Sequence, residues 1–236
     1  MRYIVSAACG LGLAFTGPAL AQTAASEPVV VVELYTSQGC SSCPPADAYL
    51  AMLATDPRVI ALALHVDYWD YIGWADSFAS PHFTARQKAY ASAAGSRTIY
   101  TPQMIVAGAE RVEGLQPELV SDLISDHLAV PHPVSLSLVR DGDRVQITAR
   151  AYPPLSRPVR VQLVRYREVE TVTIEHGENE GQTMTYRNIV TSWQPLADWS
   201  GTAPLILEVE APGAQPVVVI VQEIGPAAIL AAARLE

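Results

Sequence analysis

The most reactive side chains in this sequence are two cysteines that stand three positions apart, in the order Cys40-Ser41-Ser42-Cys43. A thiolate is both a nucleophile and a metal ligand, so such a pair can exchange disulfides with other thiols or hold a soft metal. A disulfide within the pair would close a very short loop and would remove little entropy from the unfolded chain. The spacing therefore favours chemistry over a purely structural staple.

The first 21 residues predict a signal peptide. Arg2 supplies a positive start, residues 4–14 form an apolar stretch, and Ala19-Leu20-Ala21 has the small-x-small pattern of a cleavage site after Ala21. A retained membrane anchor is the alternative, but anchors need about 20 solidly apolar residues. Cys9 lies inside the leader, so cleavage leaves only the Cys40/Cys43 pair. We expect a periplasmic or secreted protein that has no membrane attachment after cleavage, in a compartment where disulfides persist.

Composition limits the possible partners. The chain has 236 residues and a formal net charge of −9, which argues against nucleic acids and anionic membrane surfaces as partners. Apolar residues make up 50% of the chain, so a well-formed core is expected.

Residues 22–131 have the pattern of a compact α/β unit. The continuous apolar run at residues 29–36 predicts a strand buried on both faces. Pro44 and Pro45 suit the first turn of a helix, so a helix is expected to start at the cysteine pair and to run through Leu53. The further elements expected are a strand within residues 58–68, a helix at 81–94, strands at 101–106 and 111–112, and a helix at 117–128.

Residues 132–236 predict an antiparallel β-rich domain, most simply a sandwich. Pro131-His132-Pro133 is typical of a linker, and beyond it apolar and polar residues alternate. Asp141-Gly142 indicates a tight turn between two strands. The Ala-rich segment from Pro226 to Arg234 predicts a short closing helix.

The order of the N-terminal elements around the cysteine pair resembles the thioredoxin fold. A closer resemblance is carried by five stretches of the sequence, residues 33–47, 65–74, 100–104, 177–179 and 225–227. In these stretches the chain resembles the uncharacterised family of secreted proteins known as domain of unknown function 1223, so the resemblance extends over nearly the whole mature chain. That family implies no established activity.

The resemblance to thioredoxins assigns roles to four residues. Cys40, just before the helix and the more exposed position, is expected to attack, because a helix N-terminus favours a thiolate. Cys43, one turn inside the helix, is expected to resolve the mixed disulfide. Pro102 resembles the cis-proline that packs against the disulfide of this fold, with the Thr101 backbone presented to a bound peptide; an ordinary trans proline in a loop is the alternative.

Glu33 interrupts the apolar strand before the cysteines, close to where thioredoxins keep a buried acid. Burial would raise the pKa of Glu33 and fit it to exchange a proton with Cys43. A carboxylate turned to solvent at the strand end is the alternative. The loop between Glu33 and Cys40 is one residue longer than in thioredoxins.

Three aromatic residues after the second strand are candidates for binding substrate. Tyr68, Trp69 and Trp74 could line a peptide groove beside the cysteines, or they could simply cover the helix that follows. His65, at the end of the strand, is more typical of a hydrogen-bonded core histidine than of a ligand.

Three functions are compatible with these residues. The favoured one is a thiol–disulfide oxidoreductase, without cofactor, that acts on exported proteins with thiols or disulfides and depends on a further redox partner. The second is a Cu(I)-binding or metal-delivery protein in which His65 or Met104 supplies a third ligand to the cysteine pair. The third is a redox-inert binding module whose β-rich half carries the function.

Overall fold

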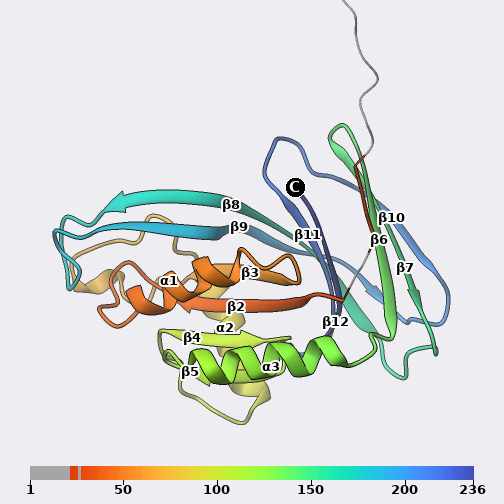
Figure 1. The fold of residues 1–236 in the computed structure, drawn as a ribbon, viewed down its shortest axis with the longest axis horizontal. Helices are drawn as coiled ribbons and strands as arrows, with labels where there is room; N and C mark the ends of the chain where they lie inside the picture. Colours follow the sequence, from red (N-terminus) through yellow and green to blue (C-terminus); the bar gives the residue numbers. More distant parts are fainter. Residues whose placement is uncertain (1–21, 26–27) are drawn as a thin grey trace, which may run out of the picture.

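The computed structural model describes residues 22–25 and 28–236, so the predicted signal peptide lies outside the described residues. None of the helices in these ranges is long and apolar enough to cross a membrane. The chain forms mixed α/β structure (Figure 1). Its elements are β1 (Gln22–Ala25), β2 (Val30–Thr36), α1 (Pro44–Leu53), β3 (Val59–His65), the 3-10 turn η1 (Asp70–Ile72), α2 (Pro81–Ala93), β4 (Gln103–Val106), β5 (Glu110–Glu113), α3 (Pro117–Ala129), β6 (Val134–Asp141), β7 (Arg144–Ala151), β8 (Val159–Thr173), β9 (Thr183–Trp199), β10 (Leu205–Glu210), β11 (Val217–Glu223) and β12 (Ile229–Leu235).

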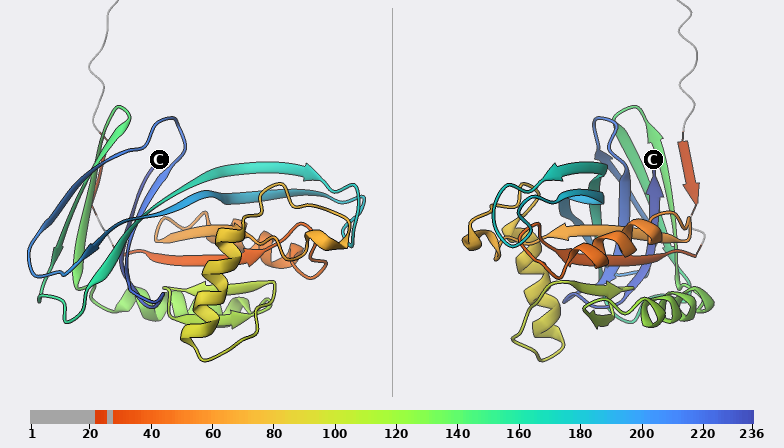
Figure 2. Two further views of the ribbon diagram at one scale, coloured as in Figure 1. Left: turned by 180° about the vertical axis from the view of Figure 1, so that it is seen from behind. Right: turned by 60° about the vertical axis from the view of Figure 1, so that its left-hand side comes forward.

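A mixed eight-stranded sheet, ordered β12-β11-β8-β9-β3-β2-β4-β5, forms the centre of the molecule. The apolar residues of β2 alternate between two cores, which explains why every residue of this strand is buried. Helices α1 and α3 cover one face of the sheet, whereas α2 crosses the opposite face (Figures 1 and 2). The predicted order of strands and helices between residues 30 and 129 is confirmed.

Strands from both sides of the expected boundary at residue 131 belong to this one sheet. β3 pairs in parallel with β9, where Ala63 lies opposite Ile189, and β2 pairs in parallel with β3. β8 and β9 form a long antiparallel hairpin that extends over the N-terminal half (Figure 1). The large sheet therefore continues across the expected domain boundary. The division into two domains stays a prediction.

A second sheet, ordered β1-β6-β7-β10, packs on part of the large one and forms a sandwich-like core. The Asp141-Gly142 turn joins β6 to β7 as predicted, with Gly142 in the left-handed region at φ 58°. The apolar residues of the core alternate along β6 and β7, and they contact residues of β8, β11 and β12.

The predicted closing helix at the C-terminus is wrong, because residues 229–235 form strand β12. This strand pairs antiparallel with β11. Ala231, Ala233 and Leu235 point into the sandwich core, and Ala232 lies in the core on the other face. Alanine favours helices, but intrinsic propensity is a weak effect that burial against a neighbouring strand overrides.

Candidate functional site

The cysteine pair forms a disulfide at the beginning of α1. Cys40 and Cys43 are bonded, with an Sγ–Sγ distance of 2.11 Å. Cys43 is the N-cap residue of α1 and Pro44 is its first residue, so the helix begins where the prolines predicted. Cys43 therefore lies at the helix start, and the expectation that it lies one turn inside the helix is wrong. The Cys43 amide donates to the Cys40 carbonyl at 3.1 Å, which closes the loop between them.

Both cysteines are buried, so the expectation that Cys40 is clearly the more exposed of the two is not met. Cys40 is 1% exposed and Cys43 is 0% exposed. The serines between them, Ser41 and Ser42, are exposed instead. The Ser42 Oγ lies 3.4 Å from the Cys40 Sγ. The two serines of the loop are thus accessible to solvent, whereas the disulfide is buried in the protein.

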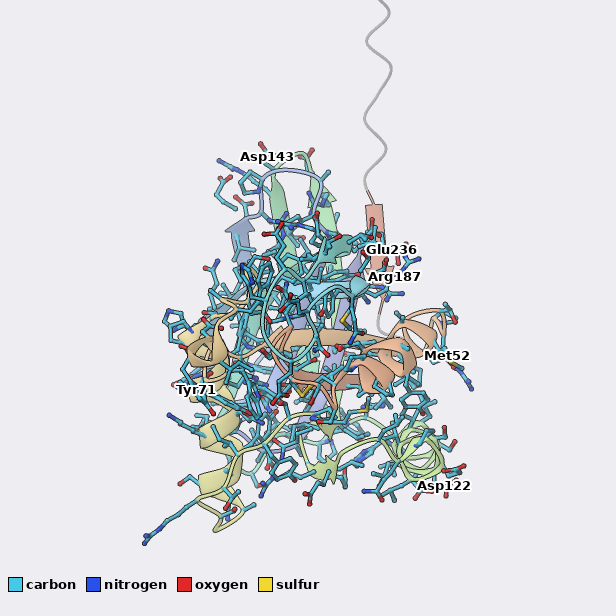
Figure 3. The ribbon with its side chains drawn as sticks, turned by 90° about the vertical axis from the view of Figure 1, so that its left-hand side faces the viewer. Met52, Tyr71, Asp122, Asp143, Arg187 and Glu236 are labelled. Carbon is cyan, nitrogen blue, oxygen red and sulfur yellow. A yellow bond between two sulfur atoms is a disulfide. The ribbon has the colours of Figure 1, made fainter. Side chains whose placement is uncertain are left out.

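The far end of the β8–β9 hairpin, residues 175–182, called here the hairpin tip, contacts residues 37–43, called here the cysteine loop (Figure 1). The Asn179 Nδ2 donates to the Gln38 carbonyl at 2.9 Å and to the Cys40 carbonyl at 3.0 Å. The Ser41 amide donates to the Glu178 carboxylate at 3.3 Å. Figure 3 looks onto this end of the molecule.

Residues 67–76, called here the aromatic loop, also contact the cysteine loop. The Trp74 Nε1 donates to the Gln38 side-chain oxygen at 2.7 Å, and the Trp74 ring meets the His176 ring edge-on, 6.4 Å between centroids. The tip and the aromatic loop therefore touch each other above the cysteine loop. Tyr71 points outward from the aromatic loop, on the side of α2 (Figure 3).

Trp69 connects the predicted peptide-docking residues to the cysteine loop. Its Nε1 donates to the Thr101 Oγ at 2.7 Å. Its Cβ would lie 3.3 Å from a Cβ placed on Gly39, so Trp69 packs directly against the residue before Cys40. The peptide bond between Thr101 and Pro102 is cis, as predicted, and Pro102 is buried.

Tyr68 lies between this group and α2. Its hydroxyl donates to the Gln87 side-chain oxygen of α2 at 3.2 Å, and burial raises the pKa of Tyr68 to about 12. Tyr68 also hydrogen-bonds the Thr101 side chain, and its ring lies beside the Trp69 ring, with 6.1 Å between centroids. Trp69 and Trp74 thus contact the cysteine loop, whereas Tyr68 contacts Trp69, Thr101 and α2.

Glu33 is buried, but it lies on the face of the sheet opposite to α1. The Arg86 guanidinium of α2 donates to its two carboxylate oxygens at 2.7 and 2.8 Å. The hydroxyls of Tyr35 and Tyr90 donate to the same carboxylate at 3.0 and 2.7 Å. Since Cys43 and α1 lie across the sheet, the expected proton exchange between Glu33 and Cys43 has no geometric basis.

The buried acid next to the cysteines is Asp47, which the sequence reasoning missed. Asp47 lies one helical turn after Cys43, so the two side chains project from the same face of α1. The Thr36 hydroxyl donates to Asp47 Oδ2 at 3.1 Å, and the buried Oδ1 has no hydrogen-bond partner among the described residues. Burial raises the pKa of Asp47 from 3.8 to about 7, although the electrostatic influence of His65 and the Thr36 hydrogen bond oppose the rise.

A buried acid–base pair, His65 and Asp76, lies close to Asp47. The His65 Nδ1 lies 2.7 Å from Asp76 Oδ2, and both side chains are inaccessible to solvent. The Gln38 amide donates to the same Asp76 oxygen at 2.8 Å, which ties this pair to the cysteine loop. His65 lies opposite Thr36 in the parallel β2–β3 register. Its Nε2 has no partner among the described residues.

The expected third copper ligands are not arranged around the cysteines. One His65 nitrogen is engaged by Asp76, and Met104 lies in the core between the sheet, α1 and α3. Residues 22–25 and 28–236 contain no group of three or more histidine, cysteine, aspartate or glutamate side chains placed to hold a metal ion.

One signal in the sequence could have identified Asp47. It is a charged residue four positions after Cys43, between Ala46 and Leu50, on the side of the helix that becomes buried. An acid at the buried position of a helix is unusual unless it has a partner or a function. The apolar spacing of the helix alone, however, does not say which face packs on the sheet.

Two solved structures and one family model are similar to this chain. Protein AGR_C_4864 from Agrobacterium tumefaciens has a crystal structure that is similar to this chain at 32% sequence identity and a TM-score of 0.76, over 89% of this chain and 95% of that one. HBP35 of Porphyromonas gingivalis has a similar fold, with a TM-score of 0.63 and 15% identity over 88% of this chain and 74% of that one. No curated protein matches the sequence. The family model described as protein of unknown function (DUF1223) matches residues 31–222, and the chain therefore belongs to this family.

Proposed function

We propose that this protein is an exported thiol–disulfide oxidoreductase that uses Cys40 and Cys43 on thiols or disulfides of exported proteins. The observation that carries the proposal is the Cys40–Cys43 disulfide at the start of α1, with the buried carboxyl group of Asp47 one turn away. A staple across four residues would contribute little to stability, whereas an acid of raised pKa beside a thiol pair suits proton transfer.

The proposed fold of residues 22–131 is thioredoxin-like. The order of β2, α1, β3, α2, β4, β5 and α3 supports it, and so does the cis bond before Pro102. In this proposal the Thr101 backbone and Trp69 form the side of the site where a substrate peptide docks, because Trp69 contacts both Thr101 and Gly39.

The exchange takes place in two steps that balance without a cofactor. A substrate thiolate attacks the Cys40 Sγ, a mixed disulfide forms, and the Cys40–Cys43 bond breaks with Cys43 as the leaving thiolate. The second substrate thiolate then attacks the substrate sulfur of the mixed disulfide and releases Cys40. Two electrons and two protons pass from the substrate dithiol to the protein, and the reverse steps reduce a substrate disulfide.

In this scheme Asp47 has the proton-transfer role that was predicted for Glu33. A neutral Asp47 carboxyl can protonate the departing Cys43 thiolate, and the carboxylate can remove the proton again when Cys43 attacks. The pKa of about 7 makes both forms of Asp47 available near neutral pH.

The first test is a redox titration of the mature protein with glutathione, followed by Trp fluorescence. We expect the disulfide to equilibrate with glutathione, because catalytic disulfides have higher potentials than structural ones. We also expect turnover in insulin reduction or in oxidation of a reduced protein, with Cys40→Ser at background. Turnover no greater than that of Cys40→Ser, together with tight Cu(I) binding lost in either cysteine variant, would replace this proposal by the metal-binding one.

The two cysteines should differ in their products with substrate. We expect Cys43→Ser to accumulate mixed disulfides with exported proteins, because the thiol that resolves them is gone. Cys40→Ser should accumulate none. Intact-mass analysis and non-reducing gels of the two variants measure this difference, and faster alkylation of Cys43 than of Cys40 in the reduced protein would reverse the assignment.

A further inference from the structure

The Asn179 side chain is the part of the hairpin tip that holds the cysteine loop. It is 1% exposed, and its single amide group donates to the carbonyls on both sides of Gly39, those of Gln38 and Cys40. Gln182 donates to the Asn179 Oδ1 at 3.1 Å and so orients the amide. These contacts join segments 139 and 141 positions apart in the chain, and one of them is made to the backbone of Cys40 itself.

Apart from Asn179, the tip is held by the contact of His176 and Gly177 with Trp74 and by weak contacts at the surface. Glu175, His176, Glu178 and Glu180 are exposed, and the Glu178 contact with the Ser41 amide is a long one. The tip joins the body of the hairpin at Ile174, which is buried and bonds through its backbone to Gly181 and Gln182. Release of the Asn179 hydrogen bonds and of the Trp74 contact would therefore let the tip move as a unit, without breaking the strands behind it.

The burial of the disulfide has a chemical consequence. A thiolate must reach a disulfide sulfur to attack it, so exchange rates depend on access as well as on thiol reactivity. Cys40 is only 1% exposed and the tip is bonded to its carbonyl, so a thiol carried on a folded protein cannot approach the disulfide in this closed arrangement. A small thiol needs a much smaller opening than a protein does.

We propose that the hairpin tip is a gate over the Cys40–Cys43 disulfide and that Asn179 is the positioning residue that keeps it closed. The gate makes exchange with protein thiols depend on displacement of the tip, while small thiols react with less opening. This inference deepens the proposed function and rests on exchange at Cys40, but the gate can be measured in a single stoichiometric reduction without turnover.

The test compares two reductants on the oxidised protein: reduced glutathione as the small thiol and reduced thioredoxin as the protein dithiol. Asn179→Asp keeps the shape of the side chain but replaces the donor by an acceptor, and Asn179→Ala removes the side chain. We expect both variants to be reduced about tenfold faster by thioredoxin, since two hydrogen bonds are lost, and to gain less with glutathione. Glu180→Ala, an exposed change on the same tip, should leave both rates unchanged.

Gln182→Ala provides a milder variant that retains the two Asn179 donations and should give a smaller change in the same direction. Equal acceleration with both reductants would indicate a general loosening and would overturn the gate. Wild-type rates in every Asn179 variant would overturn it as well, and so would complete resistance of all forms to both reductants. A protein without catalytic turnover whose Asn179 variants nevertheless show the selective acceleration would support the gate and refute the proposed enzymatic function.

Discussion

Replacement of Arg86 by methionine is expected to lower the free energy of unfolding by about 3–5 kcal/mol, because it leaves the Glu33 carboxylate buried without its cation. Glu33 is 0% exposed, and Arg86 supplies two of the four hydrogen bonds that it accepts. The guanidinium also stacks on the Trp193 ring, with its carbon 3.7 Å from the centroid. Methionine retains part of this packing, so the loss reports mainly on the unpaired charge.

Urea unfolding measures this effect against a matched pair on the surface. Arg160→Met removes a guanidinium that contacts Asp198 through two nitrogens, as Arg86 contacts Glu33, but both side chains of that pair are largely exposed. Its cost should be about 0–1 kcal/mol. Glu33→Gln combined with Arg86→Met should recover part of the loss, since no charge then remains buried. Equal costs for Arg86→Met and Arg160→Met would contradict this description of the Glu33 site.

The Arg86 variant should leave the disulfide chemistry intact. Glu33 and Arg86 lie on the α2 face of the sheet, and Cys43 and Asp47 lie on the α1 face. The rate at which glutathione reduces the folded Arg86→Met protein is therefore expected to equal the wild-type rate. A large change in this rate would restore Glu33 as a candidate partner of the cysteines.

Asp47→Asn is expected to stabilise the protein above neutral pH and to flatten its pH dependence. Burial raises the folded-state pKa of Asp47 to about 7, against 3.8 as its ordinary value. Between these two values the unfolded chain has released a proton that the folded protein keeps. The free energy of unfolding is therefore not lowered by Asp47 below about pH 4. It falls as the pH rises, and above about pH 7 the buried carboxylate lowers it by the full amount. At pH 8 the gain from Asp47→Asn should be at most about 4 kcal/mol.

Urea unfolding of the oxidised protein from pH 4 to pH 8 measures this difference. Asp56→Asn is the matched control: Asp56 lies near the end of the same helix, but it is accessible to solvent and its pKa is lowered by hydrogen bonds from Arg58. Because Asp56→Asn still contains Asp47, it should lose stability between pH 4 and pH 7 as the wild type does, whereas Asp47→Asn should not. Parallel pH profiles for wild type and Asp47→Asn would refute the raised pKa and remove Asp47 from the proposed mechanism.

Local sequence determined the elements around the cysteine pair. The apolar run of β2 could form only a strand buried on both faces, and the prolines after Cys43 fixed the start of α1. Asp141-Gly142 fixed the β6–β7 turn, because few residues other than glycine accept a positive φ. Such signals depend on neighbouring residues alone, and all three predictions are confirmed.

Contacts between distant segments decided the rest, and no local pattern contains them. The Ala-rich C-terminus became strand β12 because its pairing with β11 buries both of its faces, an effect larger than the helix propensity of alanine. Glu33 could be predicted as buried, but its partner Arg86 stands 53 positions away and places it on the face opposite to the cysteines. The cysteine pair can be recognised in the sequence. Its contacts with Asn179 and the burial of Asp47 beside it arise only when the β8–β9 hairpin and α1 pack together. Burial determines both the access to the disulfide and the pKa of Asp47, and burial is a property of the packed chain.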